Sequence, residues 1–368
     1  MRVRFPPAVF FLLGEFQMNF NSDNWAGAHP AIAENLLRHS SGTAAAYGSS
    51  NLDKQAEARF SEIFEREVAV FFVGTGTAAN SLGLAAVNRP GGVSFCHREA
   101  HMVKDECGAP EYFTGGARLQ PVDGSAGKIS PSKLQRELSR FSPDFVHAGQ
   151  PMAVSVTQAT EVGTVYSPTE LADLSQICRD HHLPLHMDGA RFANALVTLG
   201  ASPAEMTWKQ GVDLLSFGAT KNGCWCAEAL LFFNPTQARE LPYIRKRAAQ
   251  LFSKTRFIAA QFEAYLQDDL WLKLAAHANA MATGLSKLIE KSQQARLAWP
   301  VEANEVFAIA SKEEIARWQQ AGVSLYEWPI PSDLEGQVLP TEQLVRLVTS
   351  FQTSLNELSQ FEAVLTKN

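Results

Sequence analysis

Short apolar runs alternate with helical stretches from about residue 30 to residue 240, and this alternation constrains the fold most strongly. Each run is short enough to be a β-strand, and the runs end in glycine or polar residues. Strands that alternate with helices are typical of crossover units on a mainly parallel sheet, so we expect an α/β fold with a mainly parallel seven-stranded sheet. The predicted strands are residues 68–73, 92–96, 144–147, 153–157, 183–187, 213–217 and 229–233.

The pattern changes after residue 235, where two long helical stretches, 237–251 and 257–289, precede short strands around 306–309 and 345–348. A helix flanks each of these strands, which predicts a smaller α+β C-terminal domain. The expected division is an N-terminal extension outside the fold (1–17), an N-terminal segment with the large cofactor-binding domain (18–245), and connecting helices with the small domain (246–368).

The composition indicates a globular protein that binds neither nucleic acid nor a membrane surface. The chain has 368 residues, 46% of them hydrophobic, and a net charge of −6, with no basic cluster beyond the short run at 245–247. Its five cysteines lack the Cys-x-x-Cys spacing of a zinc site and are odd in number. We therefore expect reduced thiols, a cytoplasmic protein and no metal.

Lys221 stands in a turn of small residues directly after the predicted strand 213–217. A lysine that serves solubility lies among other charges, whereas Lys221 is flanked by Thr220 and Asn222. An ammonium group partly withdrawn from water loses its proton more readily, and the free amine can form a Schiff base with an aldehyde.

Asp188 ends the predicted strand 183–187, so we expect it at the carboxyl edge of the sheet, where parallel sheets bind ligands. A carboxylate there can keep a pyridine nitrogen protonated, which is how proteins tune pyridoxal phosphate (PLP). Taken alone, Asp188 could instead cap the following helix. Lys221, at the end of another predicted strand, favours the PLP interpretation.

Three further places carry candidate residues, each with a structural alternative. Gly76 and Thr77 follow the strand 68–73, and the free N–H groups of a helix that opens near Ala78 could bind phosphate, although an ordinary turn would look similar. His101 could stack on a cofactor ring, and Glu106 could act as a base or orient one through a water; the alternative is a solvated helix start.

Arg191 and Arg346 are the candidate anion binders. Arg191 follows Asp188 closely, and Arg346 lies inside an otherwise apolar strand, where an unpaired charge would be costly. A substrate carboxylate suits the forked donors of arginine. The alternatives for Arg346 are an edge strand that faces water or a pair with an acid of the protein.

These segments resemble the PLP-dependent L-threonine aldolases of the β-eliminating lyase superfamily, particularly the bacterial low-specificity branch that includes phenylserine aldolase. The resemblance runs from about Asn19 to the C-terminus, and its most specific parts are 186–191 (His-Met-Asp-Gly-Ala-Arg) and 216–223 (Ser-Phe-Gly-Ala-Thr-Lys-Asn-Gly). It implies PLP fold type I, the aspartate aminotransferase-like fold. It also implies a homodimer or homotetramer whose sites are completed across a subunit interface.

The resemblance also implies residue roles. Lys221 would form the Schiff base, Asp188 would face the pyridine nitrogen, and His101 would stack on the ring. The phosphate is expected on Gly76 and Thr77, with Arg191 also near the cofactor. The residues expected at the substrate are Ser22, Tyr47, Gln158, Arg191 and Arg346, of which Tyr47, together with Arg256, could reach a neighbouring subunit's site.

One departure concerns the base. Many members of this family carry a histidine in a Thr-His-Asn-Arg segment before the aspartate strand, and Gln158 takes that place here. An amide cannot act as a base near neutral pH, so removal of the substrate's β-hydroxyl proton is left to His101, Glu106 or water.

The expected activity is PLP-dependent cleavage of L-threonine, L-allo-threonine or a related β-hydroxy-α-amino acid such as phenylserine to glycine and an aldehyde. Because one PLP scaffold supports several reactions, β-elimination, transamination or racemisation is the alternative, and a non-catalytic PLP-binding protein is a more remote one. A small amino-acid substrate and further copies of the chain are the only partners expected.

Overall fold

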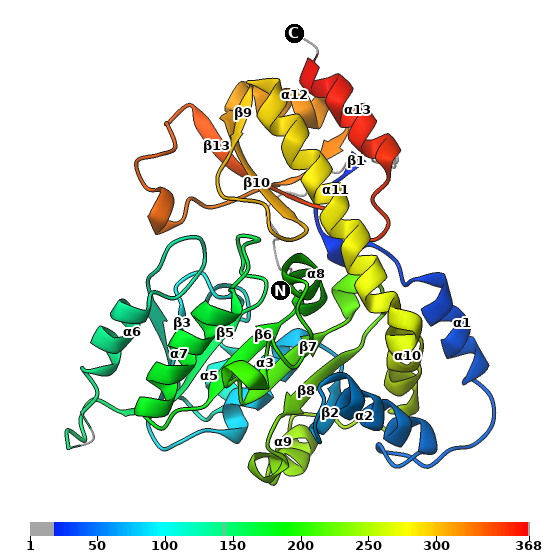
Figure 1. Ribbon diagram of the computed structural model, residues 1–368, viewed down its shortest axis with the longest axis vertical. Helices are drawn as coiled ribbons and strands as arrows, with labels where there is room; N and C mark the ends of the chain where they lie inside the picture. The colour runs from blue at the N-terminus through cyan, green and yellow to red at the C-terminus, as the bar shows by residue number, and fades with distance from the viewer. Residues whose placement is uncertain (1–17, 143, 367–368) are drawn as a thin grey trace, which may run out of the picture.

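The computed structural model describes residues 18–142 and 144–366, which form two parts, one above the other in Figure 1. The lower part is built around a seven-stranded sheet and the upper part around a four-stranded sheet. A long helix, α11 (Leu270–Ser292), runs between them. Residues 1–17, the predicted extension, lie outside the described residues.

The seven-stranded sheet has the order β2-β8-β7-β6-β5-β3-β4, and neighbouring strands are parallel except where β8 is involved. The predicted α/β fold with a mainly parallel sheet is therefore confirmed. In chain order the strands are β2 (Ala69–Val73), β3 (Gly92–His97), β4 (Arg118–Val122), β5 (Gln150–Thr157), β6 (Leu185–Gly189), β7 (Leu214–Gly218) and β8 (Glu228–Phe232).

One predicted strand is wrong. Residues 144–147 form turns, and Phe145 and Val146 are exposed. The strand that replaces it is β4, which lies at the edge of the sheet and pairs only with β3. Its Pro121 is acceptable at an edge, but a proline in a short run hides a strand from an analysis of apolar patterns.

The central strands are apolar because helices and loops cover the sheet. Every residue of β6, β7 and β8 is buried. Phe217 of β7 packs against Phe60 and Phe262, with ring centroids 5.2 and 6.1 Å away. This aromatic packing stabilises the strand that leads directly to Lys221.

Helices fill the connections between these strands. Ser50 and Ser167 begin α2 and α7 with capping boxes, in which the serine and the acid three residues later bind each other's backbone N–H. The helices before α11 are α1 (Pro30–Arg38), α2 (Asn51–Ile63), α3 (Gly76–Ala86), α4 (His101–Lys104), α5 (Ala109–Phe113), α6 (Pro131–Leu138), α7 (Pro168–Asp180), α8 (Phe192–Leu199), α9 (Leu241–Arg247) and α10 (Arg256–Leu266).

The stretch predicted as one helix over 257–289 is two helices, α10 and α11. A short 3-10 turn, η5 (Gln267–Asp269), separates them. Asp268 and Asp269 have φ angles of 50° and 55°, which a continuing α-helix does not allow. The other predicted helix, 237–251, is shorter in the structure and corresponds to η4 (Pro235–Ala238) followed by α9.

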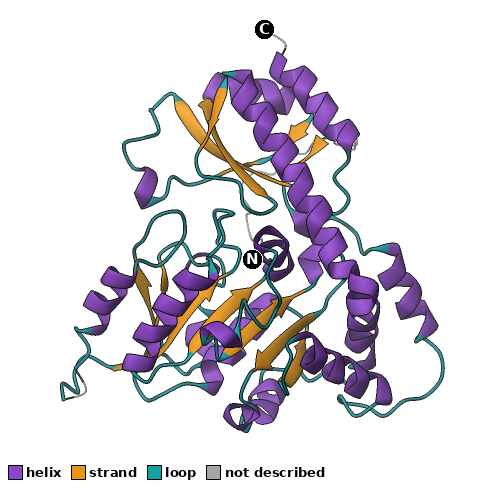
Figure 2. Ribbon diagram, viewed as in Figure 1, coloured by secondary structure: helices purple, strands orange, loops and turns teal. Residues whose placement is uncertain are grey.

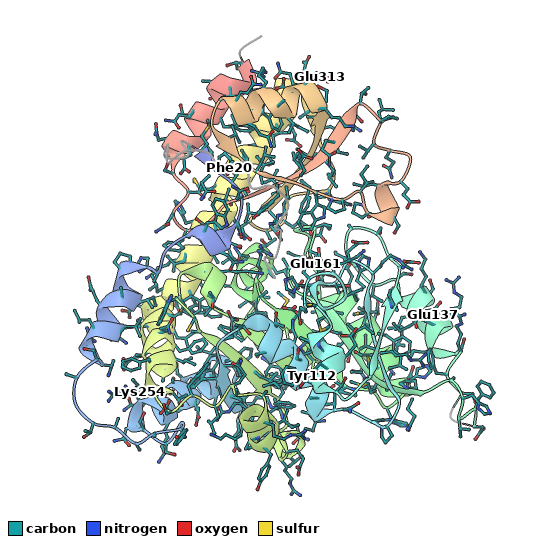
Figure 3. All side chains as sticks on the ribbon, turned by 180° about the vertical axis from the view of Figure 1, so that it is seen from behind. Phe20, Tyr112, Glu137, Glu161, Lys254 and Glu313 are labelled. Atoms are coloured by element: carbon teal, nitrogen blue, oxygen red, sulfur yellow. The ribbon has the colours of Figure 1, made fainter. Side chains whose placement is uncertain are left out.

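The upper sheet is antiparallel and has the order β12-β13-β10-β9. Its core includes Phe20 from the N-terminal segment, which Figure 3 labels within the upper part. A second, parallel pair, β1 with β11, attaches that segment there. The remaining elements are β1 (Met18–Asn19), β9 (Ala295–Leu297), β10 (Glu305–Ser311), α12 (Lys312–Gln320), β11 (Val323–Ser324), β12 (Tyr326–Glu327), β13 (Glu342–Val348) and α13 (Leu355–Thr366).

The strand directions decide where ligands can bind. Because β2, β3, β5, β6 and β7 are parallel, the segments that follow them leave the sheet at one edge, and the antiparallel β8 begins at that edge. Loops occupy much of the border between the two parts (Figure 2). Among the helices of residues 18–142 and 144–366, none has the length and apolar character to cross a membrane.

Candidate active site

A cavity of about 280 Å³ opens at the carboxyl edge of the seven-stranded sheet. Its walls come from the segments after β2, β3 and β7, from the end of β5 and the loop after it, from the end of β6 and the residues after it, from the start of β8 and from Asn24 of the N-terminal segment. Residues that are far apart in the sequence therefore meet around one space. The predicted site residues that line it are Gly76, Thr77, His101, Glu106, Asp188, Arg191 and Lys221.

Lys221 lies in a 3-10 turn, η3 (Thr220–Asn222), that is anchored on both sides. Asn222 is buried and donates from Nδ2 to the Tyr265 hydroxyl at 2.7 Å and to the Trp271 carbonyl at 2.8 Å. The Thr220 hydroxyl accepts from the Ala227 N–H at 3.1 Å. These contacts fix the turn, so the amine enters the cavity from a rigid base.

Asp188 is buried at the end of β6, and both of its carboxylate oxygens accept hydrogen bonds. Asn80 of α3 donates to Oδ2 at 2.7 Å, and the Ala190 N–H donates to Oδ1 at 3.0 Å. The same Asn80 amide donates to Glu106 Oε1 at 2.9 Å. One buried amide therefore holds two acids of the cavity in place.

His101 begins α4, and its side chain pairs with Glu106. The Nδ1 of His101 lies 2.9 Å from Glu106 Oε1, and this hydrogen bond raises the pKa of the imidazole. The carboxyl group of Glu106 is buried, and its Oε1 is engaged by both His101 and Asn80. Glu106 therefore orients His101.

The helix start at Gly76 and Thr77 opens onto free space. Helix α3 begins at Gly76, two residues before the predicted start, because Thr75 is the N-cap and its hydroxyl accepts from the Ala78 N–H at 3.1 Å. A Cβ added to Gly76 would meet no atom within 4 Å. The first N–H groups of the helix can therefore receive an anion from the cavity.

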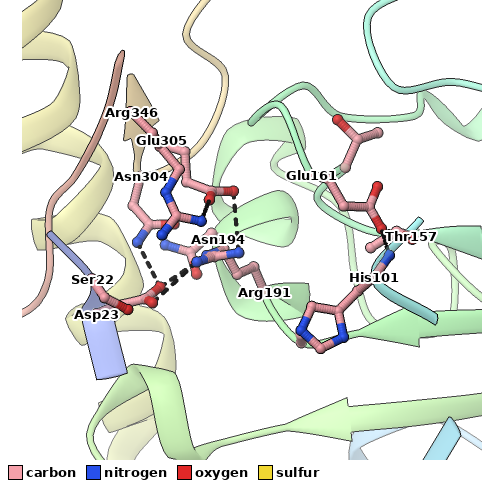
Figure 4. Close-up of polar contacts among 12 residues, drawn as sticks. Ser22, Asp23, His101, Thr157, Glu161, Arg191, Asn194, Asn304, Glu305 and Arg346 are labelled. Atoms are coloured by element: carbon pink, nitrogen blue, oxygen red, sulfur yellow. Dashed lines mark hydrogen bonds and ion pairs between the residues drawn. The ribbon is translucent and has the colours of Figure 1, made fainter. Parts of the chain in front are cut away.

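Arg191 precedes α8 and is enclosed by two acids, as Figure 4 shows. Its Nε and Nη2 bind the two oxygens of Asp23 at 2.8 and 3.0 Å, and its Nη1 lies 3.1 Å from Glu305 Oε2. Burial opposes ionisation of Asp23, but Arg191 outweighs it and holds the pKa of Asp23 below its usual value. Arg191 therefore joins the N-terminal segment to β10 at the cavity wall.

Arg346 stands in β13, which is an inner strand of the upper sheet and not an edge. Its Nη1 lies 3.7 Å from Glu305 Oε1, and its guanidinium lies over the rings of Trp328 and Tyr326 at 4.5 and 5.4 Å. Of the two alternatives for this residue, a pair with an acid of the protein is the one observed. Arg346 does not itself line the cavity.

The family comparison decides what kind of protein presents this cavity. Residues 19–313 match the family described as beta-eliminating lyase. The chain belongs to this family. This beta-eliminating lyase is 44% identical over 307 residues to the low specificity L-threonine aldolase of Pseudomonas aeruginosa, an alignment that covers 83% of this chain and 88% of that protein.

Two further similar proteins are also named as threonine aldolases. A low specificity L-threonine aldolase from a Pseudomonas species is 42% identical over the same shares of both proteins. The solved structure of a Leishmania major threonine aldolase matches with a TM-score of 0.87 and 29% identity, over 95% of this chain and 98% of that one. The predicted PLP fold type I is confirmed by this match, and the family and relatives identify the chain as a lyase.

In the lyase, several of the predicted site residues lie outside the cavity. Gln158 is fully buried, and its amide binds the backbone N–H and carbonyl of Tyr166 at 2.9 and 2.8 Å. It therefore holds the loop after β5 and does not face a substrate in this structure. Ser22 caps the short η1 (Asp23–Trp25), where its hydroxyl accepts from the Asn24 N–H at 3.1 Å.

Tyr47 and Arg256 lie away from this cavity as well. Tyr47 is half exposed, with Lys246 over its ring at 5.3 Å. Arg256 begins α10 and donates to the Gly42 carbonyl, at 3.3 Å from each terminal nitrogen. Arg256 lines a second cavity of about 430 Å³, whose other walls come from residues 38–52.

Ten residues that line the cavity were not predicted as site residues, among them Asn80, Thr157, Glu161 and Glu228. The sequence could have indicated Thr157 and Glu161, because Thr157 ends β5 and Glu161 follows it at the same edge as Asp188. Glu228 was hidden because β8 runs against the other strands, so its first residue, and not its last, lies at this edge. Burial raises the pKa of Glu161 and of Glu228 to about 7.

Proposed function

We propose that this lyase uses PLP to cleave L-threonine, L-allo-threonine or a related β-hydroxy-α-amino acid, phenylserine included, to glycine and an aldehyde. The observation that carries the proposal is that Lys221 and Asp188, from the neighbouring strands β7 and β6, line one cavity. An amine and a carboxylate in one pocket suit an aldehyde and a pyridine nitrogen. The names of the relatives favour threonine-like substrates.

The groups around the cavity fit PLP. Lys221 would hold its aldehyde, Asp188 would face its ring nitrogen, and the N–H groups at Gly76 and Thr77 would hold its phosphate, while His101 would stack on the ring. Free space at the helix start supports the phosphate position. When bound, PLP supplies an electron sink for the negative charge left on the substrate's Cα.

The substrate's carboxylate would be held by Arg346 and Ser22. Arg346 is the more available arginine, because its contact with Glu305 is long and its Nε has no hydrogen-bond partner among the described residues. Arg191 is already bound to Asp23 and Glu305, so its part is to position the wall beside the cofactor. Fixing the carboxylate limits which bond of Cα is presented for cleavage.

The test is direct. Purified protein is incubated with PLP and L-threonine, L-allo-threonine or L-phenylserine, and glycine and aldehyde are measured. We expect both products in equal amounts, and we expect Lys221→Ala to lose both the products and the cofactor's Schiff-base absorbance. Release of ammonia, an oxo acid or a D-amino acid without glycine would instead identify β-elimination, transamination or racemisation.

We also propose that the lyase is a cytoplasmic homodimer or homotetramer in which Tyr47 and Arg256 serve a neighbouring subunit's site. Their position outside the chain's own cavity supports this role, and the free cysteines support a reducing compartment. Mixing inactive Lys221→Ala with inactive Arg256→Ala protein, after dissociation, should restore part of the activity in mixed oligomers. Sedimentation gives the oligomer size, and no recovery of activity contradicts a shared site.

A further inference from the structure

Glu161 is an acid of the cavity wall that the roles above leave unused. It lies in the loop after β5, and Figure 3 labels it in the lower part, close to the border with the upper part. It faces the same cavity as Lys221, Asp188 and His101. An ionisable group at this position is able to reach a substrate bound there.

The two oxygens of Glu161 are in different situations. Oε1 accepts the His101 N–H at 2.9 Å and the Thr157 hydroxyl at 2.7 Å, contacts that Figure 4 shows. Oε2 is withdrawn from water and has no hydrogen-bond partner among residues 18–142 and 144–366. The first oxygen fixes the carboxyl group in place, and the second is a buried acceptor without a donor in the described part of the chain.

The surroundings of Glu161 suit a proton acceptor that works near neutral pH. Burial raises its pKa to about 7, and the negative charge of Asp188 acts in the same direction, whereas Thr157 and the His101 N–H oppose the rise. Arg191, Cys96 and Tyr166 are the other titratable groups that interact with it. A base whose pKa lies near the working pH transfers protons most effectively.

Gln158, Glu106 and His101 have other roles in the site. Gln158 is an amide bound to the backbone of Tyr166. Glu106 orients the imidazole of His101 through an oxygen shared with Asn80. His101 carries the role of stacking on the cofactor.

We propose that Glu161 is the base that takes the proton from the substrate's β-hydroxyl, an inference that rests on the proposed function. The O–H bond breaks, its proton passes to the Glu161 carboxylate, and its electron pair becomes the second C–O bond of the aldehyde. The Cα–Cβ bond breaks, its electron pair stays with Cα, and Cα then takes up a proton to give glycine. Glu161 returns its proton to solvent, so atoms and charge balance without a further reactant.

The principal experiment uses Glu161→Gln holoenzyme, because the amide keeps the shape and can still accept the His101 N–H but cannot take a proton. Exchange of the glycine Cα proton in D₂O is the second readout, since glycine has no β-hydroxyl. We expect the cofactor absorbance to be unchanged and the exchange rate to stay within about threefold of wild type. The kcat for threonine cleavage should fall by roughly 10²- to 10⁴-fold.

Glu99→Gln is the matched control. Glu99 lies near His101 in sequence, pairs with Lys104 at 3.4 Å and does not line the cavity, so this variant should cleave threonine at the wild-type rate. Cleavage by Glu161→Gln within threefold of wild type, or an equal loss of cleavage and glycine exchange, overturns the proposal for Glu161. A wild-type enzyme that yields no glycine and aldehyde from any substrate overturns the proposed function instead.

A second variant covers the case in which Glu161→Gln fails to bind PLP. Thr157→Val removes the hydroxyl that donates to Oε1 and that holds the pKa of Glu161 down. The acidic limb of the kcat/KM profile for threonine should then move to higher pH, while the glycine exchange profile stays in place. An acidic limb that does not move, or that moves equally in both profiles, counts against Glu161 as the base.

Discussion

Asn80 shows how much of the site depends on a side chain that touches no reacting atom. Its amide donates to Asp188, near the end of β6, and to Glu106, in the loop between α4 and α5. Without that amide, each of the two carboxylates would lose a hydrogen bond that stabilises its negative charge. The position of Asp188, which we propose to face the ring nitrogen, and the position of Glu106 beside His101 both depend on one residue of α3.

Asn80→Ala should therefore weaken cofactor binding by roughly tenfold or more, because hydrogen bonds to charged groups contribute about 1.5 to 3 kcal/mol. Titration of the cofactor-free protein with PLP, followed by absorbance, measures the change. Asn88→Ala is a suitable control, since Asn88 lies just beyond the same helix, donates to the Thr114 carbonyl, accepts from the Arg89 N–H and does not line the cavity. Equal affinities of wild type and Asn80→Ala would contradict this role.

The raised pKa of Glu161 also predicts how the stability of the protein depends on pH. Its pKa is about 7 in the folded chain and 4.5 ordinarily, so between these values the folded chain holds a proton that the unfolded chain releases. That stabilisation is fully present below pH 4.5 and is lost as pH rises through about 7. In cofactor-free Glu161→Gln protein, the fall in unfolding free energy should be shallower by up to about 1.4 kcal/mol per pH unit. Urea denaturation between these pH values checks the slope, and an unchanged slope speaks against a protonated Glu161.

At the residue scale the sequence predicts some roles well and others poorly. Asp188 and Lys221 were predictable because each directly ends or follows an apolar strand, and parallel strands bring such positions together. The direction of the Gln158 side chain was not predictable, because the loop after β5 turns its amide toward the backbone of Tyr166. The periodicity of the sequence does not indicate which of two neighbouring loop side chains points into the cavity.

At the scale of elements, the site depends on how closely β6 and β7 approach at their ends. A Cβ on Gly218 would lie 2.8 Å from the backbone of Ala190, which follows Asp188. The glycine is needed for this close approach, and it brings the segments that carry Asp188 and Lys221 to the same cavity.

Gly218→Ala should thus force β7 away from the segment after β6. We expect a loss of roughly 1 to 3 kcal/mol of stability, typical of overpacking, together with a lower kcat for threonine cleavage. Denaturation and steady-state rates measure the two effects. Gly284→Ala is the control, because its Cβ would meet only the end of the Leu358 side chain, which can move aside; comparable losses in both variants would argue against a specific strand contact.

The prediction of strands and helices from the sequence failed where the local residues depart from the apolar pattern. Pro121 concealed the edge strand β4, and the apolar run at 144–147 is exposed in a turn because β5 begins only after it. The break between α10 and α11 was missed since residues on both sides keep a helical pattern. The break lies at Asp268 and Asp269, whose φ angles are positive.

At the scale of the whole molecule, the cluster of Arg191, Asp23, Glu305 and Arg346 ties the two parts together. Asp23 comes from the N-terminal segment, Arg191 follows β6, and Glu305 begins β10. Burial raises the pKa of Glu305, although both arginines oppose the rise. Buried charges of this kind depend on each other, because the loss of one leaves its partner unpaired.

Asp23→Ala should destabilise the protein by about 3 kcal/mol, the cost of breaking a buried pair. Chemical denaturation measures the loss. Glu62→Ala breaks an exposed pair with Arg59 and should cost no more than about 0.5 kcal/mol. If both variants lose the same stability, the buried cluster is not a tie between the two parts.

Helix α11 links the two parts of the molecule mechanically. Its 23 residues form one continuous helix that contacts α8 near the border between the two parts and α13 and β9 in the upper part. Because α8 bonds to Asn279, the part of α11 beyond this contact is about 20 Å long at 1.5 Å per residue, and a tilt of about 5° there would displace its far end by about 2 Å. Because Arg191 immediately precedes α8, we expect a movement of α8 to reach the upper sheet through α11.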